Sequence, residues 1–271
     1  MNAPLLELAG VSKQFASGGR QVAGADNVSL QLARGETLAL VGPSGSGKST
    51  LARLVMRLAE PDAGTIRFDG IDLTATRGEA LRKLRPRFQM VFQDPLAAFN
   101  PRATVARVLD DPLRIHGLVA RDQRPGAIAD LLRRVGLDAA LATRRIHEIS
   151  GGQRQRVAIA RAIATRPALL VLDEAVSALD VTVRAGVLAL LAELQRSDGM
   201  SYLFISHDLA VVVAFAHRIA VIDAGRIVEI GPAADVVANP QSAIGKALVA
   251  AMPRLEAIPG KVRSGFPSGI A

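Results

Sequence analysis

The sequence has 271 residues, of which 49% are hydrophobic and 21% charged, a balance typical of a globular protein with a buried core and not of a disordered chain. Cysteine is absent, which excludes disulfides and cysteine-ligated metal sites. The net charge is +8, but the arginines are scattered and aromatic residues make up only 3%, so few side chains are available to stack on bases. We therefore expect no nucleic-acid partner.

The chain shows neither an export signal nor a membrane helix. Its first residues, MNAPLLELAG, lack the basic start and the long apolar stretch of a signal peptide. The longest apolar run, residues 209–222, is interrupted by His217 and Arg218 and is shorter than the roughly 20 residues that a membrane helix needs. We expect a protein that does not span a membrane by itself.

In chain order, the first part alternates strands with helices. Residues 37–42, TLALVG, predict a buried strand that enters a glycine-rich loop, and apolar residues then recur at helical spacing until Pro61. Further short strands are expected at residues 5–11, 27–32, 65–68 and 88–92. Such alternation is typical of an α/β fold with a mainly parallel sheet.

The middle of the chain has a different character. Residues 127–135 and 151–165 predict helices, so we expect residues 93–160 to form a mostly helical subdomain inserted into an α/β core. That core would comprise residues 1–92, which include an N-terminal β subdomain, and residues 161–240.

The last third returns to strands. Buried strands are expected at 168–174 and 201–207, and a hairpin is expected at 218–231 with Ala224-Gly225 at its turn. The C-terminal tail, residues 241–271, predicts a short helix followed by a disordered end.

The glycine-rich loop fits the phosphate-binding pattern G-x-x-x-x-G-K-[ST], and it lies between a strand and a helix as that pattern requires. Its glycines allow successive backbone N–H groups to surround a phosphate. We expect Lys48 to contact the β- and γ-phosphates of ATP, Ser49 to bind Mg²⁺, and Thr50 to contact the α-phosphate. The predicted binding residues are Gly42, Pro43, Ser44, Gly45, Ser46, Gly47, Lys48, Ser49 and Thr50.

Polar residues at the ends of other strands indicate which side chains bind the metal and act in catalysis. Residues 169–174, LLVLDE, end in two carboxylates, and beside a phosphate loop we expect Asp173 to bind Mg²⁺ and Glu174 to accept a proton from an attacking water. His207, in ISHD, and Gln93, in VFQDP, also follow strands, where ligands of such sheets bind. We assign catalytic roles to Glu174, His207, Gln93 and Lys48, and metal binding to Ser49, Asp173 and Gln93.

A second anion site is predicted about a hundred residues after the first. Residues 150–153, SGGQ, place a small hydroxyl and two glycines at the start of a helix, an arrangement that attracts anions. One ATP molecule does not need two such sites.

Together, GPSGSGKST, VFQDP, ISGGQRQR, LLVLDEAVSALD and ISHD resemble the motifs of ATP-binding subunits of ABC transporters, and the resemblance covers about residues 5–255. It implies a P-loop NTPase (RecA-like) core sheet, an antiparallel β subdomain and an inserted helical subdomain. It also implies that two ATPases pair head to tail, with the second anion site of one completing the ATP site of the other. By this resemblance, the residues that act across the pair are Ser150, Gly151, Gly152, Gln153 and Asp180.

The resemblance assigns two further contacts. Phe15 corresponds to the aromatic residue that stacks on adenine, although Tyr or Trp is more usual there. The segment Gln93–Val105 corresponds to the region that meets the membrane permease, where the helical subdomain offers a groove to a short cytoplasmic helix.

FQDPLAAFNPR, DEAVSALDVTVRAGVL and NPQSAIGKALVAAMP resemble the dipeptide, oligopeptide and nickel importers, and the second block is similar to the nickel-import ATPase of that group. Residues 241–246 depart from the usual pattern of the peptide members, so the substrate stays open between nickel and peptides.

The implied assembly contains permease subunits, a second ATPase that is either a homologue or another copy, and indirectly a periplasmic solute-binding protein. It lies at the cytoplasmic face of the bacterial inner membrane, where the chain couples ATP hydrolysis to transport. One alternative is a soluble ABC-type ATPase that acts on nucleic acid or ribosomes. Such proteins usually carry two ATPase domains or a long insertion, and this chain has neither. The other alternative is a non-catalytic nucleotide-binding regulator.

Overall fold

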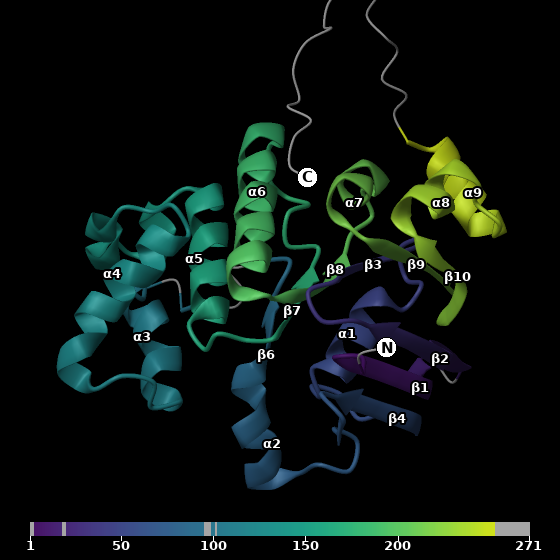
Figure 1. The fold of residues 1–271 in the computed structure, drawn as a ribbon, viewed down its shortest axis with the longest axis horizontal. Helices are drawn as coiled ribbons and strands as arrows, with labels where there is room; N and C mark the ends of the chain where they lie inside the picture. Colours follow the sequence, from purple (N-terminus) through teal and green to yellow (C-terminus); the bar gives the residue numbers. More distant parts are fainter. Residues whose placement is uncertain (1–2, 18–19, 95–98, 101, 253–271) are drawn as a thin grey trace, which may run out of the picture.

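The computed structural model describes residues 3–17, 20–94, 99–100 and 102–252, and within these residues the strands form two sheets (Figure 1). The larger sheet has the order β10-β9-β3-β8-β7-β6 and the smaller one the order β2-β1-β4-β5. The strands of the larger sheet are β3 (Thr37–Val41), β6 (Phe88–Val91), β7 (Leu169–Asp173), β8 (Ser201–Ile205), β9 (Arg218–Asp223) and β10 (Arg226–Pro232).

The centre of the larger sheet is parallel and buried. β3 lies between β8 and β9, β7 lies between β8 and β6, and all of these pairs are parallel, whereas β10 runs antiparallel to β9. Every residue of β3, β7 and β8 is buried, which explains their continuous apolar sequences. The register pairs both Leu40 and Asp173 with Ile205, so the carboxyl ends of these three strands meet at one edge. The loops that carry the predicted site start there.

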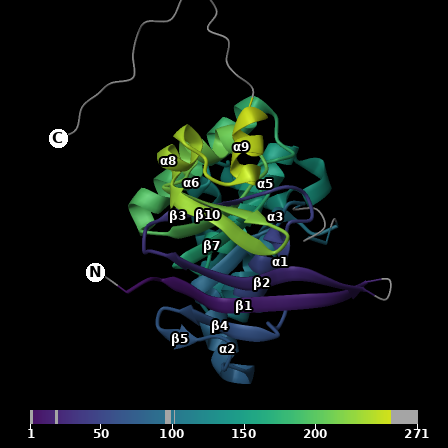
Figure 2. The same ribbon diagram turned by 90° about the vertical axis from the view of Figure 1, so that its right-hand side faces the viewer.

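The smaller sheet is antiparallel and consists of β1 (Leu6–Ser17), β2 (Arg20–Leu32), β4 (Ala63–Phe68) and β5 (Ile71–Asp72). Seen from the side, β1 and β2 form a long ribbon below the larger sheet (Figure 2). Apolar residues of this sheet, of α1 (Lys48–Val55) and of one face of the larger sheet form a common core. This core holds the phosphate loop against both sheets.

Helices cover the other face of the larger sheet. Between β6 and β7 the chain forms α3 (Val105–Ile115), α4 (Arg124–Arg134) and α5 (Gly151–Ile163), which lie side by side at one end of the molecule (Figure 1). After β7 come α6 (Val181–Asp198) and α7 (Leu209–Phe215), and the C-terminal helices are α8 (Ala233–Ala238) and α9 (Ala243–Ala250). The division of the chain into an ATPase core and an inserted subdomain stays a prediction.

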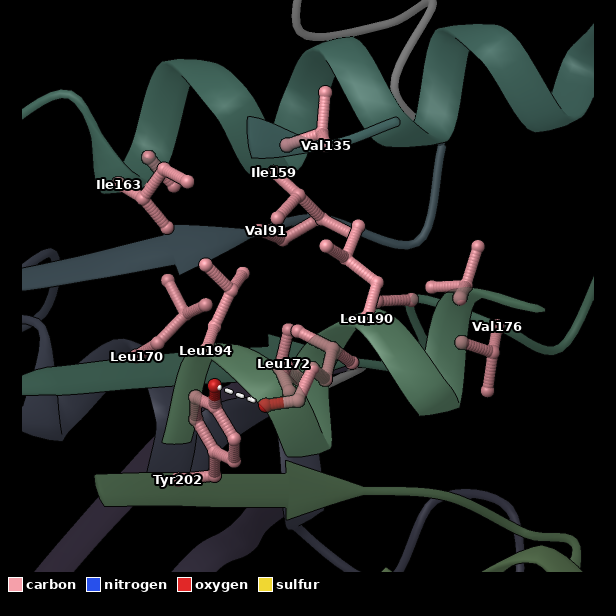
Figure 3. Close-up of a cluster of buried hydrophobic side chains, with 14 of the residues drawn as sticks. Val91, Val135, Ile159, Ile163, Leu170, Leu172, Val176, Leu190, Leu194 and Tyr202 are labelled. Carbon is pink, nitrogen blue, oxygen red and sulfur yellow. Dashed lines mark hydrogen bonds between the residues drawn. The ribbon is translucent and has the colours of Figure 1, made fainter. Parts of the chain in front are cut away.

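A second apolar core joins these helices to the sheet. Ile159 and Ile163 of α5, Leu190 and Leu194 of α6, and Leu172 of β7 belong to it (Figure 3). The hydroxyl of Tyr202, which lies in this core, donates to the carbonyl oxygen of Leu191 at 2.7 Å. Burial raises the pKa of Tyr202 far above its ordinary value, so the hydroxyl keeps the proton that it donates in this bond.

The predicted α/β fold is confirmed, and so is the hairpin turn, where Ala224 and Gly225 both have positive φ angles (45° and 83°). Two predicted strands were too short, because the antiparallel pairing of β1 and β2 continues to Ser17 and Arg20. The helix predicted at 151–165 ends at Ile163.

The predicted short helix of the tail is present as α9, whereas residues 253–271 lie outside the described residues, as do residues 95–98 and 101 of the predicted permease-facing segment. Among the residues that the structure describes, no helix combines the length and the apolar character needed to cross a membrane.

Candidate functional site

The phosphate loop joins β3 to α1 and is shaped by glycines. A side chain at Gly42 would clash with the carbonyl oxygen of Ile222, and one at Gly47, whose φ is 107°, would clash with that of Gly24. Gly45 has a φ of 79°, and a Cβ atom added there would meet nothing within 4 Å. The loop is therefore packed on its inner side, whereas its backbone at Gly45 is open to a ligand.

The loop contains hydrogen-bond donors that could bind an anion. Lys48 is buried, and its Nζ donates to the carbonyl oxygens of Gly42 at 2.9 Å and Pro43 at 2.8 Å. Burial lowers the pKa of Lys48, and the charges of Glu174 and Asp173 oppose this shift. The buried hydroxyl of Ser46 has no hydrogen-bond partner among the described residues. An orphaned hydroxyl, a lysine and a backbone that is open at Gly45 fit a bound phosphate.

Ser49 and Asp173 meet beside the loop. The Ser49 hydroxyl donates to Oδ1 of Asp173 at 3.1 Å, from the start of α1 to the end of β7. Burial raises the pKa of Asp173, the hydrogen bond from Ser49 lowers it, and the charge of Glu174 raises it further. A hydroxyl and a carboxylate next to a phosphate loop are the oxygen ligands that Mg²⁺ prefers.

Glu174 contacts two of the other predicted catalytic residues, Gln93 and His207. Its Oε2 accepts a hydrogen bond from Nε2 of Gln93 at 3.0 Å and lies 3.4 Å from Nδ1 of His207. These three residues follow β6, β7 and β8, so the edge of the sheet brings them together. The structure places Gln93 against Glu174, and its assignment to the metal stays a prediction.

The backbone of Glu174 is held in an uncommon conformation. Its φ is 48°, a left-handed value that costs energy for a residue with a side chain. Three hydrogen bonds hold it there. The N–H of Glu174 donates to the carbonyl oxygen of Ile205 at 3.0 Å, and the carbonyl oxygen of Glu174 accepts from the hydroxyl of Ser177 at 2.8 Å and from its N–H at 3.1 Å. This turn directs the carboxylate toward Gln93 and His207.

Phe15 lies on β1 next to the phosphate loop. Its ring is 43% exposed, and a Cβ atom added to Gly24 would lie 2.6 Å from that ring and 2.8 Å from the side chain of Thr50. Phe15 and Thr50 are therefore close neighbours across Gly24. An exposed ring that lies beside Thr50, at the end of the loop, can contact the base of a bound nucleotide.

The SGGQ segment starts α5 and is separate from the phosphate loop. Ser150 caps the helix, since its hydroxyl accepts from the N–H of Gln153 at 3.2 Å, while Oε1 of Gln153 accepts from the N–H of Ser150 at 2.9 Å. Gly152 packs against Val183, whereas a Cβ atom at Gly151 would meet only the guanidinium of Arg154, at 4.0 Å. Among the described residues, no hydrogen bond joins this segment to residues 42–50.

The loop after β7 ends at Asp180, which caps α6. Its Oδ1 accepts from the N–H of Val183 at 3.0 Å, and its side chain is exposed. Val181 beside it is 80% exposed, which is unusual for a large apolar residue. The first turns of α5 and α6 thus form an open surface.

Sequence reasoning missed three residues around the site. Gly24 is required by the close approach of the Phe15 ring and the Thr50 side chain, and no local signal marks it. Asp208 caps α7, and its position directly before an apolar run was a detectable capping signal. Arg184 donates to Asp208 and to the carbonyl oxygen of Leu179, contacts that the sequence does not indicate.

Comparison with known proteins agrees with this geometry. Residues 25–177 match the family model described as ABC transporter. The chain is 49% identical over 228 residues to a probable peptide ABC transporter ATP-binding protein of Sinorhizobium fredii, which covers 84% of this chain and 65% of that protein. It is 48% identical over 237 residues to the glutathione import ATP-binding protein of Escherichia coli K12, where the match covers 88% of this chain and 38% of that protein.

Solved structures are similar as well. The dimeric ATP-binding cassette MJ0796 bound to ADP and Pi has a TM-score of 0.77 at 29% identity, covering 84% of this chain and 98% of that chain. Clostridium perfringens cbiO1, part of the cbiONQ transporter complex, has the same TM-score at 27% identity, covering 88% and 92%. The chain spans less than two thirds of the curated relatives named above, but nearly all of these two structures.

Proposed function

The chain belongs to the ABC transporter family, and from this premise we propose that it binds and hydrolyses ATP to drive import through a separate membrane permease. The observation that carries the proposal is the meeting of Gln93, Glu174 and His207 at the sheet edge where Ser49 and Asp173 pair. A cluster with only a structural role would not require the residue after a buried apolar strand, Glu174, to adopt the costly left-handed backbone conformation.

Each residue of the site has a separate role in the transfer of the γ-phosphate to water. The loop N–H groups and Lys48 would hold the phosphates, and Ser49 and Asp173, which pair beside the loop, would hold Mg²⁺. The bound metal ion would neutralise charge on the phosphate oxygens. Glu174 orients the attacking water and accepts its proton, while Gln93 and His207 fix the carboxylate from either side. Phe15 contacts the adenine.

The site requires a second ATPase subunit. Ser150, Gly151, Gly152 and Gln153 are placed on an open surface and are unused by the chain's own loop, so they would bind the γ-phosphate held by a partner. The exposed Val181 and Asp180 extend this surface. The similar cassette MJ0796 is dimeric, which supports such an arrangement for this chain.

A groove between the sheet and α3 suits a permease segment. Its volume is about 380 Å³, and Phe92 and Ile115, which are 42% and 64% exposed, line it together with Phe99. Phe92 directly precedes Gln93, so a movement of Gln93 would also move a side chain that a docked helix contacts. An apolar groove of this kind accepts one face of an amphipathic helix. The chain would then lie at the cytoplasmic face of the inner membrane.

Short peptides are the proposed substrate class. The relatives named above are described as peptide and glutathione importers, and glutathione is itself a short peptide. Nickel is the second candidate substrate, and it is supported only by the resemblance of residues 173–188, DEAVSALDVTVRAGVL, to the nickel-import ATPase. None of the relatives named above is described as acting on nucleic acid or ribosomes. A periplasmic solute-binding protein would deliver the substrate to the permease.

The test is uptake in a host that lacks the gene. We expect the deletion strain to lose uptake of a labelled dipeptide or of glutathione, and the wild-type gene to restore it. The Glu174→Gln gene is the matched control and should not restore it. The purified chain should also release phosphate from ATP in a Mg²⁺-dependent reaction. Absence of phosphate release from both the chain and its isolated membrane complex would overturn the proposal.

A further inference from the structure

Arg184, the fourth residue of α6, joins two loops of the site that are far apart in sequence. Its Nη1 donates to Oδ2 of Asp208 at 2.7 Å, and its Nη2 donates to the carbonyl oxygen of Leu179 at 3.1 Å. The side chain is 23% exposed, and its Nε is buried with no hydrogen-bond partner among the described residues. A guanidinium presents its donors on separate nitrogens in a rigid fork, so Arg184 holds the two acceptors with two different nitrogens, whereas a lysine has a single one.

The first of these loops carries His207. Asp208 follows His207 directly, and its second oxygen, Oδ1, accepts from the N–H groups of Ala210 at 3.1 Å and Val211 at 3.3 Å. The N–H of Asp208 in turn donates to the hydroxyl of Ser206 at 3.0 Å. The side chain of His207 itself is 60% exposed, and its Nδ1 lies 3.4 Å from Oε2 of Glu174. Its position therefore depends on the backbone that Asp208 anchors.

The second loop ends at Asp180 on the open surface described above. Leu179, whose carbonyl accepts from Arg184, directly precedes Asp180, the residue that caps α6. Any displacement of this loop toward or away from a partner moves that carbonyl oxygen. Since Arg184 is bonded to it and to Asp208 at the same time, the movement reaches the loop of His207.

We propose that Arg184 is a positioning residue for ATP hydrolysis, which places His207 against Glu174 according to the state of the loop at Asp180. This inference rests on the proposed function. Arg184 does not touch the reacting atoms and acts through His207. In a pair of subunits, it would make hydrolysis depend on the docking of the partner. A plain surface ion pair predicts something different, namely a small effect on stability alone.

Three substitutions separate the two interpretations. Arg184→Met keeps the apolar stem and removes both hydrogen bonds. Arg184→Lys retains the charge opposite Asp208 but releases the carbonyl oxygen of Leu179. Asp208→Asn removes the charge and keeps an oxygen that can cap α7. Arg196→Met, at an exposed arginine of the same helix, is the matched control.

The experiment measures steady-state ATP hydrolysis and the melting temperature of the full chain within its isolated transporter complex. We expect Arg184→Met to lower kcat roughly tenfold, the size of one lost charge-assisted hydrogen bond, with KM and melting temperature close to those of Arg196→Met. Arg184→Lys should restore part of kcat. In a His207→Ala background, Arg184→Met should cause no further loss, because its effect passes through His207.

Two results would overturn the inference. One is a wild-type kcat in Arg184→Met, and the other is an equal loss in the presence and absence of His207. A loss of folding in Arg184→Met would be recognised from its melting temperature, and the Arg184→Lys and Asp208→Asn variants would then decide by the same comparison. If the wild-type complex itself hydrolyses no ATP, the proposed function fails and this inference fails with it.

Discussion

Ser49 and Asp173 are 124 residues apart in the chain, yet the Ser49 hydroxyl donates to Oδ1 of Asp173 at 3.1 Å. One residue starts the helix after the phosphate loop and the other ends a buried strand. This hydrogen bond joins the phosphate loop to the row of polar residues at the sheet edge. The same pair places a carboxylate in a buried position where, without a cation, its charge is costly.

Asp173→Asn should stabilise the ligand-free protein and inactivate it. Burial raises the pKa of Asp173, so the folded state disfavours its ionised form. The resulting loss of folding stability is present above the folded-state pKa and disappears as the pH falls through that pKa. At neutral pH, Asn removes the charge and can still accept from Ser49. We expect the melting temperature without nucleotide to rise by about 2–4 °C.

The same variant should lose the additional stabilisation that the wild type gains from ATP and Mg²⁺ together. Differential scanning calorimetry with and without the two ligands measures both effects. A lower melting temperature of the ligand-free variant would contradict the interpretation of Asp173 as a costly buried charge.

Glu174→Gln should retain ATP binding and lose turnover. Gln has nearly the same shape and can still accept from Nε2 of Gln93, but it cannot take a proton from water. We expect kcat to fall by at least a hundredfold, the usual contribution of a general base, with an unchanged dissociation constant for ATP. Phosphate release and equilibrium binding of a fluorescent ATP analogue give the two values. Retained turnover would remove Glu174 from the role of base.

The docking of α9 should depend on pH through Glu229. Partial burial raises the pKa of this carboxyl, but hydrogen bonds from the Ser242 hydroxyl and from the N–H groups of Gln241 and Ser242 outweigh burial and hold the pKa below its usual range. A depressed pKa means that the stabilisation is present above the unfolded value of 4.5 and is lost as the pH falls through the folded value.

Hydrogen exchange of the α9 amides tests this dependence. In Glu229→Gln they should exchange faster than in the wild type at pH 7, and the difference should vanish in acid below the folded pKa. Glu193→Gln, at an exposed glutamate of α6, should exchange like the wild type. Equal α9 exchange in Glu229→Gln and wild type at pH 7 would show that the carboxylate does not hold the helix.

Much of the fold could be predicted because its signals are local. The buried strand before Gly42 and the strand that ends at Asp173 are continuous apolar runs, and the turn at Ala224-Gly225 contains a glycine, which the φ of 83° at Gly225 favours. By contrast, α2 (Gly78–Leu84) was not predicted, and none of its residues is buried. A helix without a buried face leaves no apolar periodicity in the sequence.

The site was predicted residue by residue but not as a geometry. The phosphate loop is contiguous in sequence, so its spacing alone indicates a function. The contacts of Glu174 with Gln93 and His207 depend on how three strands lie in one sheet, which no local pattern specifies. Arg184 lies between Val183 and Ala185 near the start of α6, and its two acceptors are known only once α6 and α7 are in place.

The central claim is that the SGGQ segment of this chain completes the ATP site of another subunit. Gly151→Ala tests it most directly, because a Cβ atom there would meet only the guanidinium of Arg154 within the chain, at 4.0 Å, and should interfere with an approaching phosphate alone. Gly126→Ala in α4 is the matched control, since this glycine is also exposed and a Cβ atom there would meet nothing within 4 Å.

The measurement is ATP hydrolysis by the complex isolated through each tagged variant, alongside ATP binding by the isolated chain. For Gly151→Ala we predict a loss of hydrolysis of about a hundredfold, comparable to removing one donor to a transition-state oxygen, with normal ATP binding and a normal melting temperature. Gly126→Ala should hydrolyse ATP like the wild type. Full hydrolysis by the Gly151→Ala complex would contradict a site shared between subunits.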